Sequence, residues 1–345
     1  MLDTPNSVAL PTRAFGRTDM SITRVGFGAW AIGGGDWAVG WGAQDDRESI
    51  EAIRHAVKSG INWIDTAAVY GLGHSEEVVK EALSVFNENE RPYVFTKCGL
   101  VWDEKDRKAM PRRVGAPASI RRELEASLRR LGVERIDLYQ MHWPATDGTP
   151  IETYWQTLLD LKKEGKVRAV GLSNHSAAQL ETAEKIGHVD TLQPPFSAIR
   201  RDVATDILPW CAAHQTGVIV YSPMQSGLLT GTFSEARVKE LPKNDWRSRD
   251  PEYSGEKLQH NLALAEAMKP IATKHKTSVA TVAIAWTLAW PGVTGAIVGA
   301  RAPKQVDGWL DAGRIELDTE DMQAIAGAIE TTGAGSGPAK PANLK

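Results

Sequence analysis

The chain has 345 residues, of which 42% are hydrophobic and 24% are charged, and its formal net charge at pH 7 is −3. This balance is typical of a soluble globular protein. No block of five or six like charges occurs, so we expect no nucleic-acid partner. The sequence also lacks a run of eighteen apolar residues and a secretory leader, which predicts no membrane partner and a cytoplasmic location.

The two cysteines, Cys98 and Cys211, lie far apart and lack the spacing of a metal site. We expect both to be buried thiols in a reducing compartment, and we expect no bound metal.

Residues 12–25 predict a short polar hairpin around Gly16 and Asp19. After the hairpin, eight apolar runs alternate with segments of helical periodicity. The predicted strands span 25–30, 61–67, 93–99, 136–142, 167–174, 191–196, 217–223 and 295–300. The predicted helices span 46–59, 74–86, 117–131, 151–165, 176–187, 205–216, 257–290 and 303–312.

Strict alternation of strands and helices favours parallel βαβ units, and eight units favour a closed barrel, the α/β class known as the (β/α)8 or TIM barrel. We expect one barrel domain over residues 1–330 and a flexible tail over 331–345, which is rich in glycine and proline. The two long loops, 31–45 and 224–255, are predicted to lie at the C-terminal face of the barrel, where barrel enzymes build their active sites.

Polar side chains follow three consecutive predicted strands. Asp65 ends the second strand, with Tyr70 in the loop after it, and Lys97 and His142 end the third and fourth strands. Each residue alone has an ordinary structural explanation. Strand ends converge at the mouth of a barrel, however, so the four side chains together predict a catalytic group.

These four residue types can form a general acid. A lysine ammonium close to a phenol is expected to lower the pKa of Tyr70, and a carboxylate would hold the lysine in place. A histidine can orient a substrate oxygen beside the phenol. We therefore expect proton donation to a carbonyl oxygen, with hydride supplied by a bound cofactor.

The segment "IDTAAVYGLGHSEEVVKEAL" resembles a motif of the aldo-keto reductase superfamily. "VFTK", "RIDLYQMHWP", "KVRAVGLSNHS", "LQPPFSAIRRD" and "VYSPMQSGLLTG" follow in the family's order, and the resemblance covers about residues 12–330. It is greatest for the bacterial branch with β-subunit-like and stress-protein-like members. The resemblance implies an (α/β)8 barrel and a catalytic tetrad of Asp65, Tyr70, Lys97 and His142, with Tyr70 as the proton donor.

No G-x-G-x-x-G motif follows a strand, so the sequence does not predict a Rossmann nucleotide site. The loops 222–229 and 299–305, which follow the last two predicted strands, are the expected phosphate-binding segments, because their small residues let backbone amides approach an anion.

The family resemblance implies an NADPH site, with NADH as a second possibility. In it, Ser173, Asn174 and Gln193 would hold the nicotinamide carboxamide, Tyr221 would stack on the ring, and Arg301 would lie near the 2′-phosphate. Gln305 is followed by Gly308 and Trp309, where the family often has an adenine-binding Glu-Asn pair. The remaining predicted cofactor contacts are Gly28, Ala29, Trp30, Ser222, Pro223, Met224, Gln225, Ser226, Gly227, Leu228, Val298, Gly299, Ala300, Gln305 and Trp309.

Six of the twelve tryptophans fall on or beside predicted upper loops: Trp30, Trp37, Trp41, Trp102, Trp143 and Trp246. The first five are candidates for an aromatic substrate pocket that suits a sugar-like or cyclic carbonyl compound. Packing that merely holds a loop explains them equally well.

The sequence thus predicts an NAD(P)H-dependent oxidoreductase that reduces an aldehyde or ketone. A non-catalytic regulatory subunit that binds nucleotide on the same barrel is the alternative. A barrel isomerase that uses Lys97 as a Schiff base is less favoured, because it leaves Tyr70 and the 222–229 loop without a role. The physiological substrate, the reaction direction and the oligomeric state stay open.

Overall fold

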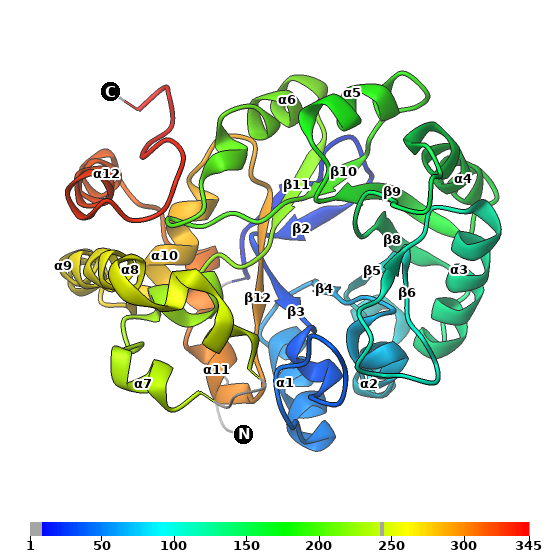
Figure 1. The fold of residues 1–345 in the computed structure, drawn as a ribbon, viewed down its shortest axis with the longest axis horizontal. Coiled ribbons are helices and arrows are strands. Elements are labelled where there is room, and N and C mark those ends of the chain that lie inside the picture. Colours follow the sequence, from blue (N-terminus) through cyan, green and yellow to red (C-terminus); the bar gives the residue numbers. More distant parts are fainter. Residues whose placement is uncertain (1–8, 242–244, 345) are drawn as a thin grey trace.

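A closed barrel of eight parallel strands forms the centre of the molecule (Figure 1). This computed structural model describes residues 9–241 and 245–344. The predicted (β/α)8 barrel is confirmed, and each of the eight expected strands is present. Around the barrel they are β3 (Val25–Gly28), β4 (Trp63–Asp65), β5 (Tyr93–Cys98), β8 (Ile136–Met141), β9 (Val167–Ser173), β10 (Thr191–Gln193), β11 (Gly217–Val220) and β12 (Gly295–Gly299).

Pairing between the first and last barrel strands closes the ring. Ala296 and Val298 of β12 lie opposite Val25 and Phe27 of β3 in parallel register. The barrel interior is filled by apolar side chains, among them the buried Trp63 and Phe95. The barrel is therefore packed in its interior, and the strand ends at its C-terminal mouth are placed to line a site.

Helices surround the barrel, as the alternating pattern predicts (Figure 1). They are α1 (Asp46–Lys58), α2 (His74–Leu83), α3 (Pro117–Leu131), α4 (Ile151–Lys163), α5 (Ala177–Glu184), α6 (Ile207–His214), α7 (Glu235–Lys239), α8 (Gly255–Ala267), α9 (Lys269–Lys274), α10 (Val279–Leu288), α11 (Pro303–Asp307) and α12 (Thr319–Thr332). Over 9–241 and 245–344, none of the helices has both the length and the apolar character needed to cross a membrane.

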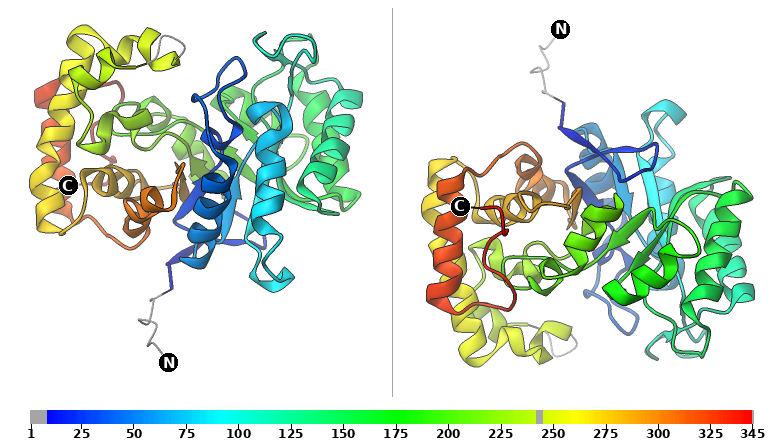
Figure 2. Two further views of the ribbon diagram at one scale, coloured as in Figure 1. Left: turned by 90° about the horizontal axis from the view of Figure 1, so that it is seen from below. Right: turned by 90° about the horizontal axis from the view of Figure 1, so that it is seen from above.

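The single helix predicted for 257–290 is wrong, because three helices, α8, α9 and α10, occupy this range. Pro270 lies in the first turn of α9 and has no N–H group with which to continue α8. Lys276 has a left-handed backbone with φ of 52°, and Ser278 caps α10 by accepting a hydrogen bond from the amide of Thr281 at 3.0 Å. Helix α12, which the sequence analysis did not predict, packs beside α8 on the outside of the barrel (Figure 2).

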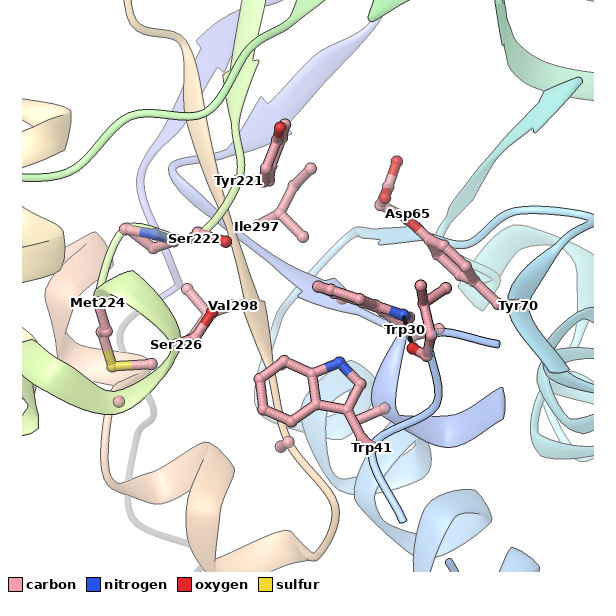
Figure 3. Close-up of a pocket in the computed structure, with 18 of the residues that line it drawn as sticks. Trp30, Trp41, Asp65, Tyr70, Tyr221, Ser222, Met224, Ser226, Ile297 and Val298 are labelled. Atoms are coloured by element: carbon pink, nitrogen blue, oxygen red, sulfur yellow. Dashed lines mark hydrogen bonds between the residues drawn. The ribbon is translucent and has the colours of Figure 1, made fainter. Parts of the chain in front are cut away.

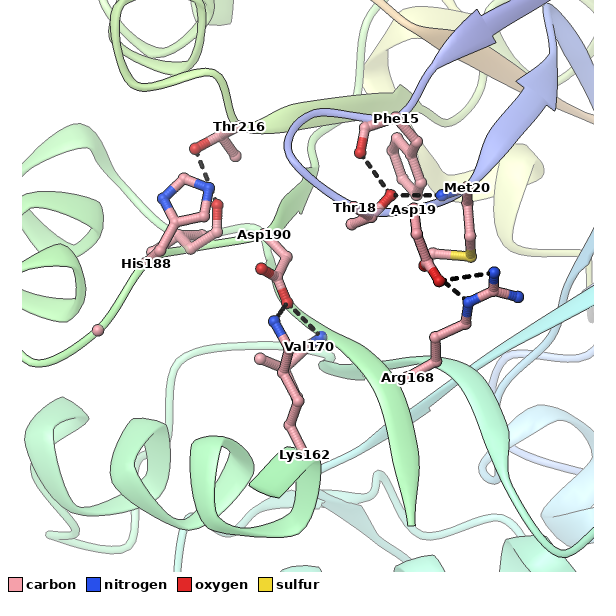
Figure 4. Close-up of polar contacts among 12 residues, drawn as sticks. Phe15, Thr18, Asp19, Met20, Lys162, Arg168, Val170, His188, Asp190 and Thr216 are labelled. Carbon is pink, nitrogen blue, oxygen red and sulfur yellow. Dashed lines mark hydrogen bonds and ion pairs between the residues drawn. The ribbon is translucent and has the colours of Figure 1, made fainter. Parts of the chain in front are cut away.

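The predicted N-terminal hairpin is confirmed as β1 (Thr12–Ala14) and β2 (Ser21–Thr23), which pair in antiparallel fashion. Its buried Phe15 stacks on Phe95 inside the barrel, with ring centroids 5.7 Å apart. Asp19 accepts two hydrogen bonds from Arg168 of β9, at 2.7 and 2.9 Å (Figure 4). The hairpin thus covers the N-terminal end of the barrel, opposite the loops that follow β3 and β11 (Figure 2).

A second hairpin, absent from the sequence prediction, follows β5. Its strands β6 (Leu100–Val101) and β7 (Arg112–Arg113) pair in antiparallel fashion, with Leu100 opposite Arg113. The hairpin interrupts the βα unit between β5 and α3 and adds a wall at the mouth of the barrel.

Residues 334–338, within the tail predicted for 331–345, make hydrogen bonds to the barrel. Arg201 is 3% exposed, and its guanidinium donates hydrogen bonds to the carbonyls of Ala334 and Pro338, both at 3.1 Å. Ser336 pairs with the backbone of Ile199 and Arg201, at 3.0 and 2.9 Å. The sequence of small residues allows this close packing, so residues 334–338 are attached to the barrel. Both cysteines are buried thiols, as expected.

Candidate active site

The four predicted catalytic residues come together at the C-terminal mouth of the barrel. Asp65 is the last residue of β4, Lys97 lies near the end of β5, and His142 directly follows β8. Tyr70 begins the 3-10 helix that follows β4. Neighbouring parallel strands end at the same level, and this places the four side chains in one cluster.

Lys97 is the centre of this cluster. Its ammonium donates a hydrogen bond to Oδ1 of Asp65 at 2.6 Å and to the carbonyl of Thr66 at 2.9 Å. A third, longer hydrogen bond of 3.4 Å reaches the hydroxyl of Tyr70. The second carboxylate oxygen of Asp65 accepts a hydrogen bond from Nε2 of Gln193 at 2.8 Å. The buried ion pair is therefore fixed in position beside the phenol.

The expectation that Lys97 lowers the pKa of Tyr70 does not hold in this structure. Burial raises the pKa of Tyr70 well above its ordinary value, and the charge of Asp65 raises it further. The positive charge of Lys97 is offset by Asp65, which lies closer to the ammonium than the phenol does. Burial also lowers the pKa of Lys97, although the Asp65 carboxylate opposes this shift. Tyr70 is thus a fully protonated phenol at neutral pH.

His142 is neutral at neutral pH. Burial lowers the pKa of its imidazole well below the ordinary value, and the charges of Lys97 and Arg113 lower it further. Its ring lies edge-on to Tyr70, with ring centroids 5.7 Å apart. A neutral imidazole has one N–H donor, so His142 can donate a hydrogen bond to an oxygen placed beside the phenol.

Two glycines determine where the Tyr70 loop lies. Gly71 has a left-handed backbone with φ of 63°, which glycine adopts at no steric cost. A Cβ atom on Gly33 would lie 2.6 Å from the amide nitrogen of Gly71 and 2.7 Å from the carbonyl carbon of Tyr70. The loop after β3 and the loop after β4 therefore pack backbone against backbone, and this contact fixes the position of the Tyr70 backbone.

A cavity of about 830 Å³ opens above the tetrad, and Figure 3 shows Asp65 and Tyr70 across it from Tyr221 and Ser222. Asp65, Tyr70 and His142 line the cavity, while Lys97 is buried behind Asp65. Most of the predicted cofactor residues also line it, namely Gly28, Ala29, Trp30, Ser173, Asn174, Gln193, Tyr221, Ser222, Pro223, Met224, Ser226, Gly227, Val298, Gly299, Ala300, Arg301, Gln305 and Trp309.

Two predicted cofactor residues lie elsewhere. The side chain of Leu228 is fully buried in the hydrophobic core. Gln225 lines a separate, polar cavity of about 340 Å³, and its Oε1 accepts a hydrogen bond from Ser197 at 3.1 Å. Both residues were predicted to contact the cofactor because they lie in this loop. The turns of the loop direct their side chains away from the main cavity.

The residues that would hold the nicotinamide carboxamide already form a network. Asn174 donates to the carbonyl of His142 at 3.0 Å and accepts from the hydroxyl of Tyr221 at 2.8 Å. Ser173 donates to the backbone carbonyl of Gln193 at 2.8 Å. These bonds fix the side chains in one arrangement, with the aromatic ring of Tyr221 on the cavity wall beside them (Figure 3).

The opposite end of the cavity suits the phosphates of a dinucleotide. Gly28 and Gly299 lie opposite each other on neighbouring strands. Because neither has a side chain, this part of the cavity wall is backbone only. In the loop after β11, Ser222 and Ser226 have left-handed backbones, with φ of 56° and 49°, and Gly227 has φ of 111°. Successive turns of this kind turn backbone amides toward one concave surface, which is a common anion-binding arrangement. The residues present therefore fit a dinucleotide cofactor.

Arg301 also lines the cavity, and its guanidinium has protein partners. It donates hydrogen bonds to Oε1 of Gln44 and to the carbonyl of Ala43, and Gln44 donates back to the carbonyl of Arg301 at 3.0 Å. The amide of Arg301 donates to Gln305 at 2.7 Å. Arg301 thus connects the loop after β12 to the long loop after β3.

Four of the five tryptophans predicted for the substrate pocket, Trp30, Trp37, Trp41 and Trp143, line the cavity. Trp102 does not, and the Arg130 guanidinium lies over its ring at 6.0 Å. Trp246 is not on the wall either. It stacks on Trp30 at 6.4 Å and meets Trp41 edge-on at 5.9 Å, and so it joins the two long loops.

The structure adds wall residues that sequence reasoning missed. Leu100, Met110, Pro111 and Arg113 come from the β6–β7 hairpin, and Val39, Val69, Arg247 and Ile297 also line the cavity. The two-residue strands of the hairpin have no periodic pattern, so their sequence carried no signal for this wall.

A parallel barrel with this tetrad at its mouth defines a class of barrel oxidoreductases. Residues 24–330 match the Aldo/keto reductase family, and the chain belongs to it. It is therefore an oxidoreductase acting on carbonyl or CH–OH groups, in a family that uses NAD(P)H.

Among its relatives, the chain is 34% identical over 316 residues to aldo-keto reductase YhdN of Bacillus subtilis, covering 91% of this chain and 92% of that protein. It is 35% identical over 329 residues to the NADH-specific methylglyoxal reductase of Escherichia coli, covering 91% and 98% of the two chains. The solved structure of the glycerol dehydrogenase AKR11B4 from Gluconobacter oxydans superposes with a TM-score of 0.85 at 39% identity, covering 94% of this chain and 97% of that one.

Proposed function

We propose that the protein reduces an aldehyde or ketone to an alcohol, with Tyr70 as the proton donor and NADPH as the preferred cofactor. One observation carries this proposal: the Tyr70 hydroxyl lies 3.4 Å from an ammonium that is itself fixed by Asp65 at 2.6 Å, on the wall of a cavity that also holds His142. The relatives named a methylglyoxal reductase and a glycerol dehydrogenase support a carbonyl–alcohol reaction.

When bound, a nicotinamide cofactor would supply the hydride for the carbonyl carbon. His142 donates a hydrogen bond to the carbonyl oxygen and orients it beside Tyr70. Burial raises the pKa of Tyr70 and keeps its phenol protonated, so the hydroxyl is available to donate a proton to the alkoxide that forms. The ammonium of Lys97 then stabilises the phenolate that remains.

Cofactor contacts are proposed for the cavity residues on β9–β12 and their loops. Ser173, Asn174 and Gln193 would bind the carboxamide, and Tyr221 would stack on the nicotinamide ring. The left-handed turns of the loop 222–227 would bind the pyrophosphate, and Arg301 would contact a 2′-phosphate. The tryptophans on the wall would cover a cyclic or sugar-like substrate.

The test is steady-state turnover of NADPH and NADH with aldehydes, ketones and sugar-derived carbonyls, for the native protein and for Tyr70→Phe. We expect kcat of the variant to fall by at least a hundredfold, because it loses the proton donor, while its affinity for NADPH stays within a few-fold. Retained turnover in Tyr70→Phe would contradict the assigned role. Tight nucleotide binding without turnover in the native protein would instead favour a regulatory subunit.

A further inference from the structure

Arg113 is a cationic side chain on the wall of the active-site cavity. It has no role in the proposed proton transfer or in the proposed cofactor site. It lies on β7, in the hairpin that follows β5, and it lines the cavity together with Trp143 and His142. In the ring of strands, β5 and β8 are on the opposite side of the barrel from β11 and β12, whose loops form the phosphate end (Figure 1). Arg113 is therefore on the substrate side of the cavity.

The guanidinium of Arg113 has no acceptor within 9–241 and 245–344. Its carbonyl accepts hydrogen bonds from Thr146, but its side chain makes neither a hydrogen bond nor an ion pair with any residue in those ranges. It is held instead by Trp143, whose ring lies 4.4 Å from the guanidinium carbon. A cation stacked on an aromatic face keeps its N–H groups directed outward in its plane, free to bind an anion.

The other charged groups on the wall are already neutralised or hydrogen-bonded. Asp65 is paired with Lys97, and Arg247 donates to Asp245 at 2.7 Å. Arg301 donates to Gln44 and to a backbone carbonyl. Arg113 is thus the one cationic side chain of the described wall that lacks a polar partner.

The charge of Arg113 acts on the reaction centre. Burial is the main cause of the lowered pKa of His142, which directly precedes Trp143 in the chain, and the charges of Lys97 and Arg113 lower it further. The carboxylate of Asp65, the single acidic group on the described wall, is occupied by Lys97. The substrate side of the cavity therefore favours a negatively charged group close to the reacting carbonyl.

We propose that Arg113 binds an anionic group of the substrate, so that the enzyme selects carbonyl compounds bearing a carboxylate or a phosphate. This proposal rests on the proposed carbonyl reduction and names the substrate class for the same site. A guanidinium binds either anion through two parallel N–H donors, and this would place the carbonyl between Tyr70 and His142. Arg113 is then a specificity residue of the hairpin rather than a member of the tetrad.

The adjacent Arg112 provides a matched control. It has the same side chain on the same short strand, but it is exposed and does not line the cavity. The variants Arg113→Gln and Arg112→Gln remove one positive charge each, so they change the net charge of the protein equally.

The experiment compares kcat/KM for two matched pairs of substrates. One pair is 4-carboxybenzaldehyde and its methyl ester, and the other is glyceraldehyde 3-phosphate and glyceraldehyde. In the native enzyme we expect at least one charged member to be preferred over its neutral partner. Arg113→Gln should lower that preference about tenfold or more, while Arg112→Gln should leave it unchanged. The substrate pair whose preference falls in Arg113→Gln shows whether the residue binds a carboxylate or a phosphate.

Binding of 4-(hydroxymethyl)benzoate, measured by isothermal titration calorimetry, provides a readout that does not require turnover. We expect Arg113→Gln to weaken this binding about tenfold and Arg112→Gln to leave it unaltered. Equal kcat/KM within both pairs, or an equal response of the two variants, would overturn the role of Arg113 while carbonyl reduction stands. Absence of turnover with every carbonyl tested would refute the proposed function, and the calorimetry would then decide the anion site by itself.

Discussion

The ammonium of Lys97 lies 2.6 Å from the carboxylate of Asp65, and both side chains are almost completely buried. Removal of one side chain of a buried ion pair leaves the other charge buried without a partner. This single change destabilises the fold more than replacement of both charged side chains by apolar ones. The pair therefore links the stability of the barrel to its chemistry.

We expect Lys97→Met to lose most of its activity and to lower the free energy of unfolding by about 3–5 kcal/mol, because Asp65 stays buried without its partner. The double variant Asp65→Asn/Lys97→Met should recover much of that stability but none of the activity. Urea unfolding of the native protein, both single variants and the double variant measures the coupling. Additive effects of the two substitutions would show that the two side chains do not interact.

Gly33→Ala should reduce activity without unfolding the protein. The new methyl group would lie 2.6 Å from the amide of Gly71 and would push the Tyr70 loop away from its position. A misplacement of a catalytic group of about 1 Å can lower kcat by up to about a hundredfold.

The control for this substitution is Gly327→Ala in α12, where a Cβ atom meets nothing within 4 Å. Steady-state kinetics and thermal unfolding of both variants test the expectation. Unchanged kcat in Gly33→Ala would show that the contact between the two loops does not position Tyr70.

The buried His175 should make the protein less stable as the pH falls. Burial lowers the pKa of His175 to about 4, and its ring is bound by Tyr154 at 2.9 Å and by the carbonyl of Ser173 at 2.8 Å. The unfolded chain takes up a proton near pH ~6.5, while the folded chain does so only near pH 4, so stability is present above pH ~6.5 and is lost as the pH falls toward 4.

This one group should cost about 2 kcal/mol between pH 7 and pH 5. We expect His175→Gln to be less stable than the native protein at pH 7 but to lose less on acidification. Urea unfolding at the two pH values gives the difference, and equal losses in the two proteins would contradict it.

Arg301→Ala should weaken NADPH about tenfold more than NADH, because only NADPH carries the 2′-phosphate that the guanidinium is proposed to bind. The substitution also breaks the hydrogen bond to Gln44, which fixes the long loop after β3. Gln44→Ala breaks the same connection and keeps the cation, so it should affect both cofactors alike. Paired fluorescence titrations with NADPH and NADH measure this, and an equal effect of Arg301→Ala on both cofactors would argue against a phosphate contact.

The strands and the tetrad could be predicted because each depends on a local pattern. Strands buried on both faces need continuous apolar runs, and a parallel barrel brings the ends of such runs to one mouth, so Asp65, Lys97 and His142 followed from their positions alone. Helix α12 also had detectable signals, since Asp318 caps its first turn and Gly333 ends it with φ of 65°.

Other features depend on contacts between segments that are distant in the sequence. The pKa of Tyr70 is set by how deeply the phenol is buried and by how completely Asp65 offsets Lys97, and the residue types alone reveal neither. Arg113 lies on the cavity wall because β6 pairs with β7, and the segment 334–338 is held by its contact with Arg201. Neither contact can be read from the local sequence.

The two halves of the chain meet where β12 pairs with β3, and they contribute different groups to the cavity. The tetrad and Arg113 belong to the part of the chain that is made first, while the loops 222–227 and 299–305 belong to the part that is made last. A nascent or truncated chain can therefore hold the tetrad and still lack the loops that are proposed to bind the cofactor phosphates. Two fragments divided between β8 and β9 would each be inert, and recovery of turnover on mixing them would report closure of the ring.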